Sequence, residues 1–356
     1  MKTQLHWSFA TAGGVNTANA IGYLAGSLLA ARIAARFGSR RTFVGSFLVT
    51  GGSLLGCALT TSLLPLLLLR AVSGFSGAAT FVVGAGLLVQ TVSARGGAGP
   101  LPMAVYSAGT GTGIAASGLT VPVLLAALSD SVGWRVAWAL LGVLTFAALL
   151  AVLPAARRTV EPPPAPVRTG DSWPAAKLVP ALLAYSLFGV GCIAYLTFIV
   201  AFLQHEGVGT VGVAGFWCLL GLAGVVGPLC WSPVLRRLGH SARTAAVLGV
   251  LAVGAGIPLL TQSAVAGLVS TILFGTSFLM VVAVFTDIAR AQLAPHQWTP
   301  AIGGLTVAFA TGQSAGPVLA GLLADTAGGI ELGLAVSTGV LFVAAGVSLA
   351  QRPAPR

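Results

Sequence analysis

The sequence predicts an all-α, polytopic membrane protein built from two related helical halves, and three observations lead to this prediction. The 356-residue chain is 56% hydrophobic and only 7% charged, with a mean hydropathy of +0.96, so it has too few charges to cover a soluble domain. Its apolar segments are about 20 or more residues long, enough to cross roughly 30 Å of hydrocarbon as a helix. A glycine and arginine pattern also occurs twice.

Charged residues, prolines and glycine turns divide the chain into eleven apolar spans. The alternating pattern of outer-membrane strands is absent, so we predict that all the spans are helices. In chain order they are residues 10–31, 42–61, 63–92, 102–128, 133–153, 178–203, 209–235, 243–262, 264–290, 297–324 and 328–350.

Each boundary has a local cause. The first span stops at Arg32 and the second starts after Arg41, because charged side chains disfavour hydrocarbon. Lys177 likewise precedes the sixth span, and Arg290 closes the ninth. Asp325 ends the tenth span, before the glycine turn that leads into the last one.

The repeated pattern relates the two halves. Gly26 and Gly38 have the same separation as Gly227 and Gly239, and an arginine stands two residues before the second glycine of each pair. Shifting the chain by this offset pairs each later span with an earlier one, except span 178–203, whose partner would precede Met1. We therefore expect a six-plus-six architecture that lacks its first helix and begins outside the membrane. A gene start assigned too late would explain this, and a genuine eleven-helix protein is the alternative.

The segment 154–177 separates the halves 1–153 and 178–356. It is rich in proline and charge, so we predict a flexible cytoplasmic linker. If the first helix runs inward, the linker and nearly all lysines and arginines lie in the cytoplasm, and only Lys2 and Arg135 lie outside. The net charge of +11 therefore reflects topology rather than nucleic-acid binding.

The arginine-rich turn after the first span resembles a known signature. Arg36, Gly38, Arg40 and Arg41 are similar to the cytoplasmic signature loop of the major facilitator superfamily (MFS), with Ala35 where that loop carries an aspartate. The resemblance implies that these residues take part in gating, whereas the missing aspartate removes the usual ion pair. Arg236, Arg237 and Gly239 occupy the related turn of the second half.

Two further stretches extend the resemblance. Arg70 resembles the arginine of the superfamily's fourth-helix motif, which is followed here by Ser73, Gly74, Gly77 and Ala78. The next span is similar to the glycine- and proline-rich fifth helix of MFS exporters, through Tyr106, Gly109, Gly111, Gly113, Gly118 and Pro122. The stretches NTANAIGYLAG, FGVGCIAYLTF and FATGQSAGPVLAGLLAD resemble most closely the YbfB/YjiJ-type bacterial branch. The resemblance implies a two-half MFS bundle of a bacterial inner membrane.

Polar residues inside apolar spans are the substrate-binding candidates. Asn16, Asn19 and Tyr23 share one helix face, where their side chains could bond a ligand or a neighbouring helix. Arg70 is the one charge well inside a span, so it anchors an anionic substrate, acts as a coupling element or pairs with helix-end carbonyls. The remaining candidates are Tyr106, Tyr195, Thr197, Phe198 and Gln313.

Four glycines and one acid are candidates for conformational roles. The spacing of Gly74, Gly77, Gly109 and Gly113 predicts close helix approach, which a rocking transporter needs. Asp287 either forms a cytoplasmic latch with Arg290, Arg236 or Arg237, or is a solvated helix-end acid.

The chain also excludes some functions. It has no phosphate-binding loop and no metal-ligand spacing among its cysteines, so we predict no cofactor and no enzymatic activity. No acid or histidine lies in mid-membrane, so proton coupling is only what the family implies. We therefore expect a monomeric secondary transporter that exports a small organic molecule. The alternative is a non-transporting receptor or decayed relative.

Overall fold

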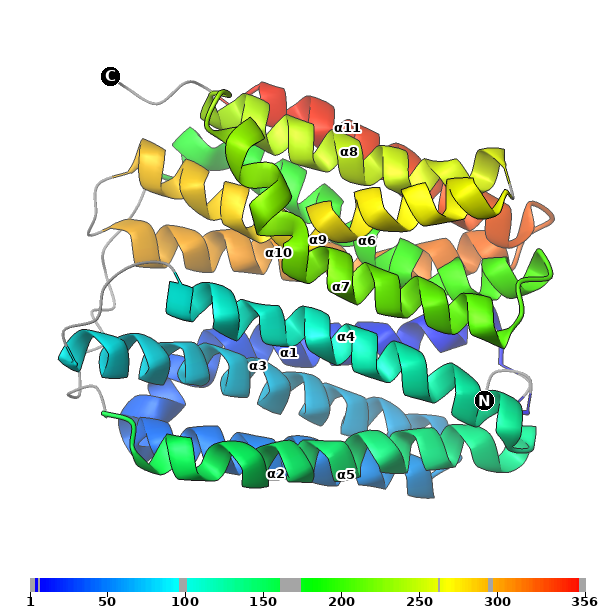
Figure 1. Cartoon of the computed structure of the whole chain (residues 1–356), viewed down its shortest axis with the longest axis horizontal. Coiled ribbons are helices and arrows are strands. Elements are labelled where there is room, and N and C mark those ends of the chain that lie inside the picture. Colours follow the sequence, from blue (N-terminus) through cyan, green and yellow to red (C-terminus); the bar gives the residue numbers. More distant parts are fainter. Residues whose placement is uncertain are drawn as a thin grey trace. The chain divides into compact units, whose positions relative to one another are not determined.

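The computed structural model describes residues 4, 5, 7–95, 101–160, 174–261, 263–293 and 297–351. These residues form 11 helices that are long and apolar enough to cross a membrane, and none of them lies in a strand (Figure 1). In chain order the helices are α1 (Phe9–Phe37), α2 (Ser39–Leu59), α3 (Leu63–Ala94), α4 (Leu101–Ala127), α5 (Asp130–Arg157), the short 3-10 helix η1 (Ala175–Leu178), α6 (Val179–His205), α7 (Thr210–Leu235), α8 (His240–Leu260), α9 (Ala264–Gln292), α10 (Trp298–Ala324) and α11 (Gly329–Leu349).

All eleven predicted spans are confirmed as helices, and their largest errors lie at ends that carry arginine. The helix α1 continues to Phe37 and α5 continues to Arg157, several residues beyond the predicted stops. A helix satisfies its own backbone hydrogen bonds, so it need not end where the hydrocarbon ends, and arginine stems can extend back along it. Most of the predicted linker, residues 161–173, lies outside the described residues.

The chain divides into two compact units. Unit 1 comprises residues 1–7, 18–109 and 124–169, and unit 2 comprises 8–17, 110–123 and 170–356. Within unit 1, α2 packs against α3 and α5; within unit 2, α8 packs in the corresponding way against α9 and α11, and α6 packs against α10 and α11. We use the term outer end for the end of each helix that the charge pattern predicts outside the cytoplasm. This is the N-terminal end of the odd-numbered helices α1 to α11 and the C-terminal end of the even-numbered helices α2 to α10.

The surface and the core of the helices have the composition expected in lipid. Leu59, Val211 and Leu260 are 82%, 85% and 86% exposed, which would be unfavourable in water. Inside unit 2, Tyr185 stacks on Phe285 with ring centroids 4.3 Å apart and forms part of an aromatic core. Buried aromatic contacts of this kind fix the packing of α6 against α9.

The glycines of the repeated pattern make the same backbone contact in the two units. In unit 1, Gly26 of α1 packs directly against the carbonyl of Phe75 of α3. In unit 2, Gly227 of α7 packs directly against the carbonyl of Thr276 of α9. Neither position has room for a Cβ, so both repeats need glycine there.

A second contact follows the same offset. Gly74 of α3 faces the carbonyl of Asn19, and Gly275 of α9 lies where a Cβ would be 2.8 Å from the carbonyl of Leu220. The two repeats therefore share a helix-packing geometry as well as a sequence pattern. This confirms the repeat that the sequence predicts between the helix pairs α1–α3 and α7–α9.

Candidate functional site

A polar cluster in unit 1 surrounds the guanidinium of Arg70; we call Asn19, Arg70, Ser73 and Trp138 the Arg70 cluster. Arg70 lies in the second turn of α3, and its Cζ is 5.0 Å from the centroid of the Trp138 ring on α5. Its Nη1 donates to Ser73 Oγ at 3.3 Å, one helical turn later. The Ser73 hydroxyl also lies 3.3 Å from Oδ1 of Asn19 on α1. Three helices thus contribute to the cluster.

The charge of Arg70 is held in apolar surroundings. The side chain is half-buried, and its Nε has no hydrogen-bond partner among the described residues. The sequence holds seven acids, and none lies in the segments that form α1 to α4. An arginine inside a span is costly unless it faces a partner, a cavity or the interface. The Trp138 face supplies partial compensation, because aromatic rings attract cations.

Tyr106 and Tyr23, which are also substrate-binding candidates, differ in their contacts. The Tyr106 hydroxyl donates to the carbonyl of Phe81 at 2.9 Å, and the two rings lie 5.4 Å apart. This hydroxyl therefore fastens α4 to α3. Tyr23 is half-buried on α1, one turn after Asn19.

The other polar candidates form hydrogen bonds within unit 2. Asn16 Nδ2 donates to Thr197 Oγ1 at 3.0 Å, which joins the start of α1 to α6. The neighbouring Thr17 hydroxyl donates to the carbonyl of Ser314 on α10 at 2.6 Å. Gln313 is buried, with 8% of its surface exposed. These contacts agree with the helix-joining interpretation of the amides.

Tyr195 and Phe198 lie in the core of unit 2. Tyr195 is 1% exposed and stacks on Phe274 with centroids 4.7 Å apart. Phe198 is 4% exposed and makes an edge contact with Phe9 at 5.8 Å. Both rings are therefore covered by neighbouring parts of the chain in this structure, and their role in substrate binding stays a prediction.

Among the described residues, close helix approach occurs at one of the four glycines for which we predicted it. Gly74 packs against α1, as described above. A Cβ at Gly77, Gly109 or Gly113 would meet no heavy atom of the described residues within 4 Å. On α4 the tight contacts are made instead by Gly111 and Gly118, against α7. At 100° per residue, Gly111 and Gly118 lie on the face of α4 opposite to Gly109 and Gly113, so the spacing on α4 did not identify the face that meets a neighbour.

Asp287 forms an ion pair that the sequence did not suggest. Its Oδ2 lies 2.8 Å from Nη1 of Arg243, at the end of unit 2 that the charge pattern predicts on the cytoplasmic side. The same arginine donates through Nε to the carbonyls of Leu235 and Leu238, at 2.7 and 2.8 Å. Arg243 therefore ties the loop between α7 and α8 to α9. The side chain of Arg290, one of the predicted partners, is outside the described residues.

The corresponding turn of unit 1 is held differently. Gly38 adopts a φ of 89°, a conformation that favours glycine, and connects α1 directly to α2. Arg40 Nη2 donates to the carbonyl of Thr159 after α5, at 2.7 Å. The Arg36 guanidinium lies 5.7 Å from the Phe37 ring, and Arg41 is exposed.

At the outer end of unit 2, Asp325 receives two backbone hydrogen bonds from the first turn of α1. Its Oδ1 accepts from the Phe9 amide at 2.8 Å and its Oδ2 from the Ala10 amide at 3.0 Å. A carboxylate is favoured there because helix N-termini carry partial positive charge and unsatisfied N–H groups. No sequence pattern indicates this contact, since the partners are far apart in the chain.

Comparisons with known proteins agree with this architecture. The family model described as "Uncharacterised MFS-type transporter YbfB" matches residues 1–349. No curated protein matches the chain at a significant level.

Three solved structures illustrate the fold. The crystal structure of the nucleoside transporter NupG is 13% identical, with a TM-score of 0.74 over 99% of this chain and 92% of that one. A bacterial homologue of the human lysosomal transporter Spinster, in an inward-facing and occupied conformation, is 14% identical, with a TM-score of 0.76 over 98% and 90% of the two chains. The human organic anion transporter MFSD10 is 17% identical, with a TM-score of 0.62 over 94% and 83%. At these identities the likeness shows the fold alone.

Proposed function

The chain belongs to the family of MFS-type transporters represented by YbfB, and from this premise we propose that it is a secondary transporter of a small organic molecule in a bacterial inner membrane. The observation that carries the proposal is the Arg70 cluster. A transporter of polar molecules needs polar groups within its membrane-spanning helices. This cluster provides the guanidinium of Arg70, the amide of Asn19 and the hydroxyl of Ser73 within such helices.

We propose that the substrate carries an anionic group. The positive charge of Arg70 has no acid from α1 to α4 to neutralise it, and a carboxylate or phosphate would bond its guanidinium. Trp138 would then support the cargo beside the anion, and Asn19 and Tyr23 of α1 would supply further polar contacts. One of the structural neighbours, MFSD10, is an organic anion transporter, which is compatible with this substrate class.

The ion pair of Arg243 with Asp287 is proposed to act as a cytoplasmic latch. The two side chains are 25% and 42% exposed, so the pair is screened and contributes only about 0.2 to 1 kcal/mol to stability. An interaction of this size holds a loop in one state without preventing its movement, as alternating access requires.

Export is the proposed direction, because α4 resembles the fifth helix of MFS exporters. For energy coupling, no aspartate, glutamate or histidine of the sequence lies in the middle of a span. We therefore propose that the substrate's own gradient, including the membrane potential acting on its charge, drives net movement. The chain is proposed to work as a monomer.

The test is a counterflow assay in proteoliposomes, with a panel of labelled organic anions and neutral analogues. Counterflow exchanges labelled for unlabelled substrate and needs no coupling ion, so it detects binding and translocation together. We expect exchange of an anion and little exchange of its neutral analogue. Arg70→Ala should reduce exchange at least about a hundredfold, because a desolvated arginine–anion pair contributes several kcal/mol.

Arg135→Ala is the matched control. Arg135 lies in the same unit, with its Cζ 4.9 Å from the ring of Trp134, and donates to the carbonyl of Ala58 at 3.3 Å. Its removal should leave exchange within about threefold of the wild type. Equal losses in the two variants would remove Arg70 from substrate binding. No exchange by a correctly folded wild-type chain for any compound of the panel would favour the non-transporting receptor.

A further inference from the structure

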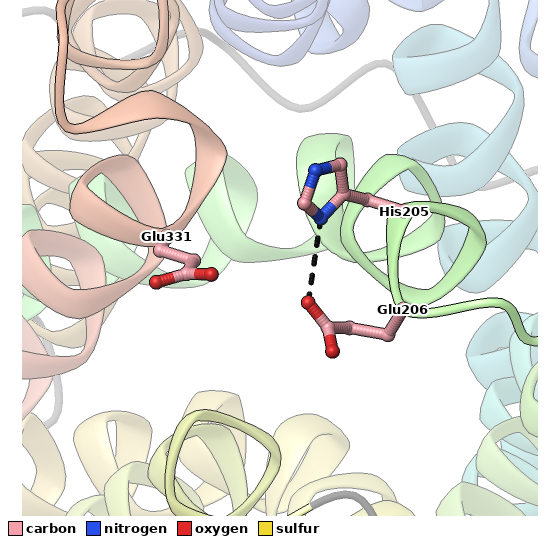
Figure 2. Close-up of side chains that lie close together, drawn as sticks. All are labelled: His205, Glu206 and Glu331. Atoms are coloured by element: carbon pink, nitrogen blue, oxygen red, sulfur yellow. Dashed lines mark hydrogen bonds and ion pairs between the residues drawn. The ribbon is translucent and has the colours of Figure 1, made fainter.

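Three side chains that can bind a metal ion converge at the outer end of unit 2. His205 and Glu206 end α6, and Glu331 lies in the first turn of α11 (Figure 2). One candidate ligand atom from each residue lies within 4.8 Å of the other two. We propose that His205, Glu206 and Glu331 bind a zinc-class divalent cation, independently of the transport cycle.

The end of α6 explains how two consecutive residues can face the same partner. Adjacent residues of a continuing helix point about 100° apart, which would separate their side chains. Here the helix stops: Gly207 has a φ of 79°, and its amide donates to the carbonyl of Gln204 at 3.1 Å. The Val208 amide donates to the carbonyl of Leu203 at 2.8 Å. This pair of hydrogen bonds is a Schellman motif, and it fixes the turn that carries both ligands.

The ligand spacing suits a small, borderline-soft cation. Ligand atoms about 2.1 Å from a tetrahedral zinc ion lie roughly 3.4 Å from one another. His205 Nδ1 and Glu206 Oε1 are already 3.3 Å apart. Figure 2 shows the Glu331 carboxylate directed toward the same space from α11. Because His205 and Glu331 are both exposed, small side-chain rotations suffice to complete three-ligand binding.

The charge distribution favours a cation at this place. The sequence segments that form this outer end, residues 201–215, 255–268 and 320–335, contain Glu206, Asp325 and Glu331 but no lysine or arginine. Glu206 also caps the C-terminus of α6, the helix end at which negative charge is disfavoured. A divalent ion between Glu206 and Glu331 would neutralise the negative charge of this end and offset the unfavourable charge at the C-terminus of α6.

The choice of a zinc-class ion follows from the ligand set. Calcium and magnesium prefer six or more oxygen ligands, whereas an imidazole nitrogen is a common ligand of zinc and related transition metals. Three protein ligands leave one position for water. Glu206 and Glu331 also line a cavity of about 430 Å³, bounded by Phe202 and residues 258–261, which offers space for that water.

The experiment is a titration of the purified full chain with Co²⁺, followed by its visible absorption, and then displacement by Zn²⁺. The protein should be purified without a histidine tag, because the imidazoles of a tag would compete for Co²⁺. We expect one Co²⁺ per chain, displaced by Zn²⁺ and unaffected by excess Mg²⁺ or Ca²⁺. His205→Ala and Glu331→Gln should each weaken binding at least about tenfold. Both side chains are exposed, so neither change threatens folding.

Two control variants separate this site from general charge or imidazole effects. Asp325→Asn removes one negative charge at the same outer end, and His240→Ala removes an imidazole at the cytoplasmic end; both should bind Co²⁺ within about twofold of the wild type. The proposal is overturned by the absence of saturable binding up to about 1 mM Co²⁺. Equal affinity in wild type, His205→Ala and Glu331→Gln would also overturn it, and displacement of Co²⁺ by Ca²⁺ or Mg²⁺ would refute the assignment to the zinc class.

Discussion

The two repeated helix pairs, α1–α3 in unit 1 and α7–α9 in unit 2, share their backbone contacts but not their chemistry. Across the repeat, the positions of Asn19, Arg70 and Ser73 correspond to those of Leu220, Thr271 and Phe274. In unit 2 these three side chains are 1%, 4% and 0% exposed, so they belong to a packed interior. The shared backbone contacts therefore serve as a scaffold in both units. At these three positions only unit 1 carries a charged residue, Arg70, on this scaffold, and this is the unit in which we propose that substrate binds.

The helix ends that the charge pattern predicts in the cytoplasm show the opposite asymmetry. The pair Arg243 and Asp287 of unit 2 corresponds to Thr42 and Gly86 of unit 1, which cannot form an ion pair. The Thr42 hydroxyl instead donates to the carbonyl of Gly38 at 2.8 Å. The arginine that we propose binds substrate and the ion pair that we propose acts as a latch thus lie in different repeats. Each can be changed by mutation, with the corresponding position of the other repeat as an internal control.

The largest expected effect comes from the contact that the repeats share. Gly26→Ala and Gly227→Ala should each destabilise the protein by about 1 to 3 kcal/mol, because a methyl group would push α1 from α3 or α7 from α9. The effect is measured as the shift of the thermal unfolding midpoint in detergent, with the loss of monodisperse protein as the signal. Similar losses in the two variants would support a common scaffold.

Gly113→Ala is the matched control for these variants. It also replaces a helix glycine, but its Cβ would meet nothing within 4 Å among the described residues, so its midpoint should stay the same or rise slightly. If Gly113→Ala were as destabilising as Gly227→Ala, the destabilisation would come from replacing any helix glycine and not from the close helix contact.

The sequence predicts those features that depend on local composition. The eleven spans, their order and the repeat offset follow from apolar runs and from the positions of arginine and glycine, and the structure confirms them. Features that depend on which distant turns meet were missed. Examples are the pair of Arg243 with Asp287 and the carboxylate of Asp325 on the start of α1. A residue type gives its chemistry, but only packing decides its neighbour.

A difference of similar size is expected at the turn glycines, but at only one of the two. Gly38 has a φ of 89°, whereas Gly239 has a φ of −71° and open space around its Cβ position. Gly38→Ala should therefore destabilise unit 1 by about 1 to 3 kcal/mol through backbone strain, while Gly239→Ala should be nearly neutral. Unfolding midpoints in detergent again provide the measurement. Equal effects at the two turns would mean that strain at Gly38 is not what distinguishes them.

The smallest expected effect concerns the latch, and a double-mutant cycle of Arg243→Gln and Asp287→Asn isolates it. Since both side chains are partly exposed, their coupling free energy should be only about 0.2 to 1 kcal/mol. Arg243→Gln alone should nevertheless cost more than Asp287→Asn, because the Arg243 Nε also bonds the carbonyls of Leu235 and Leu238. A coupling free energy above about 2 kcal/mol would indicate that the ion pair is a permanent structural contact rather than a latch that opens. The reverse order of the single variants would show that the carboxylate, and not the arginine, holds the loop of unit 2 in place.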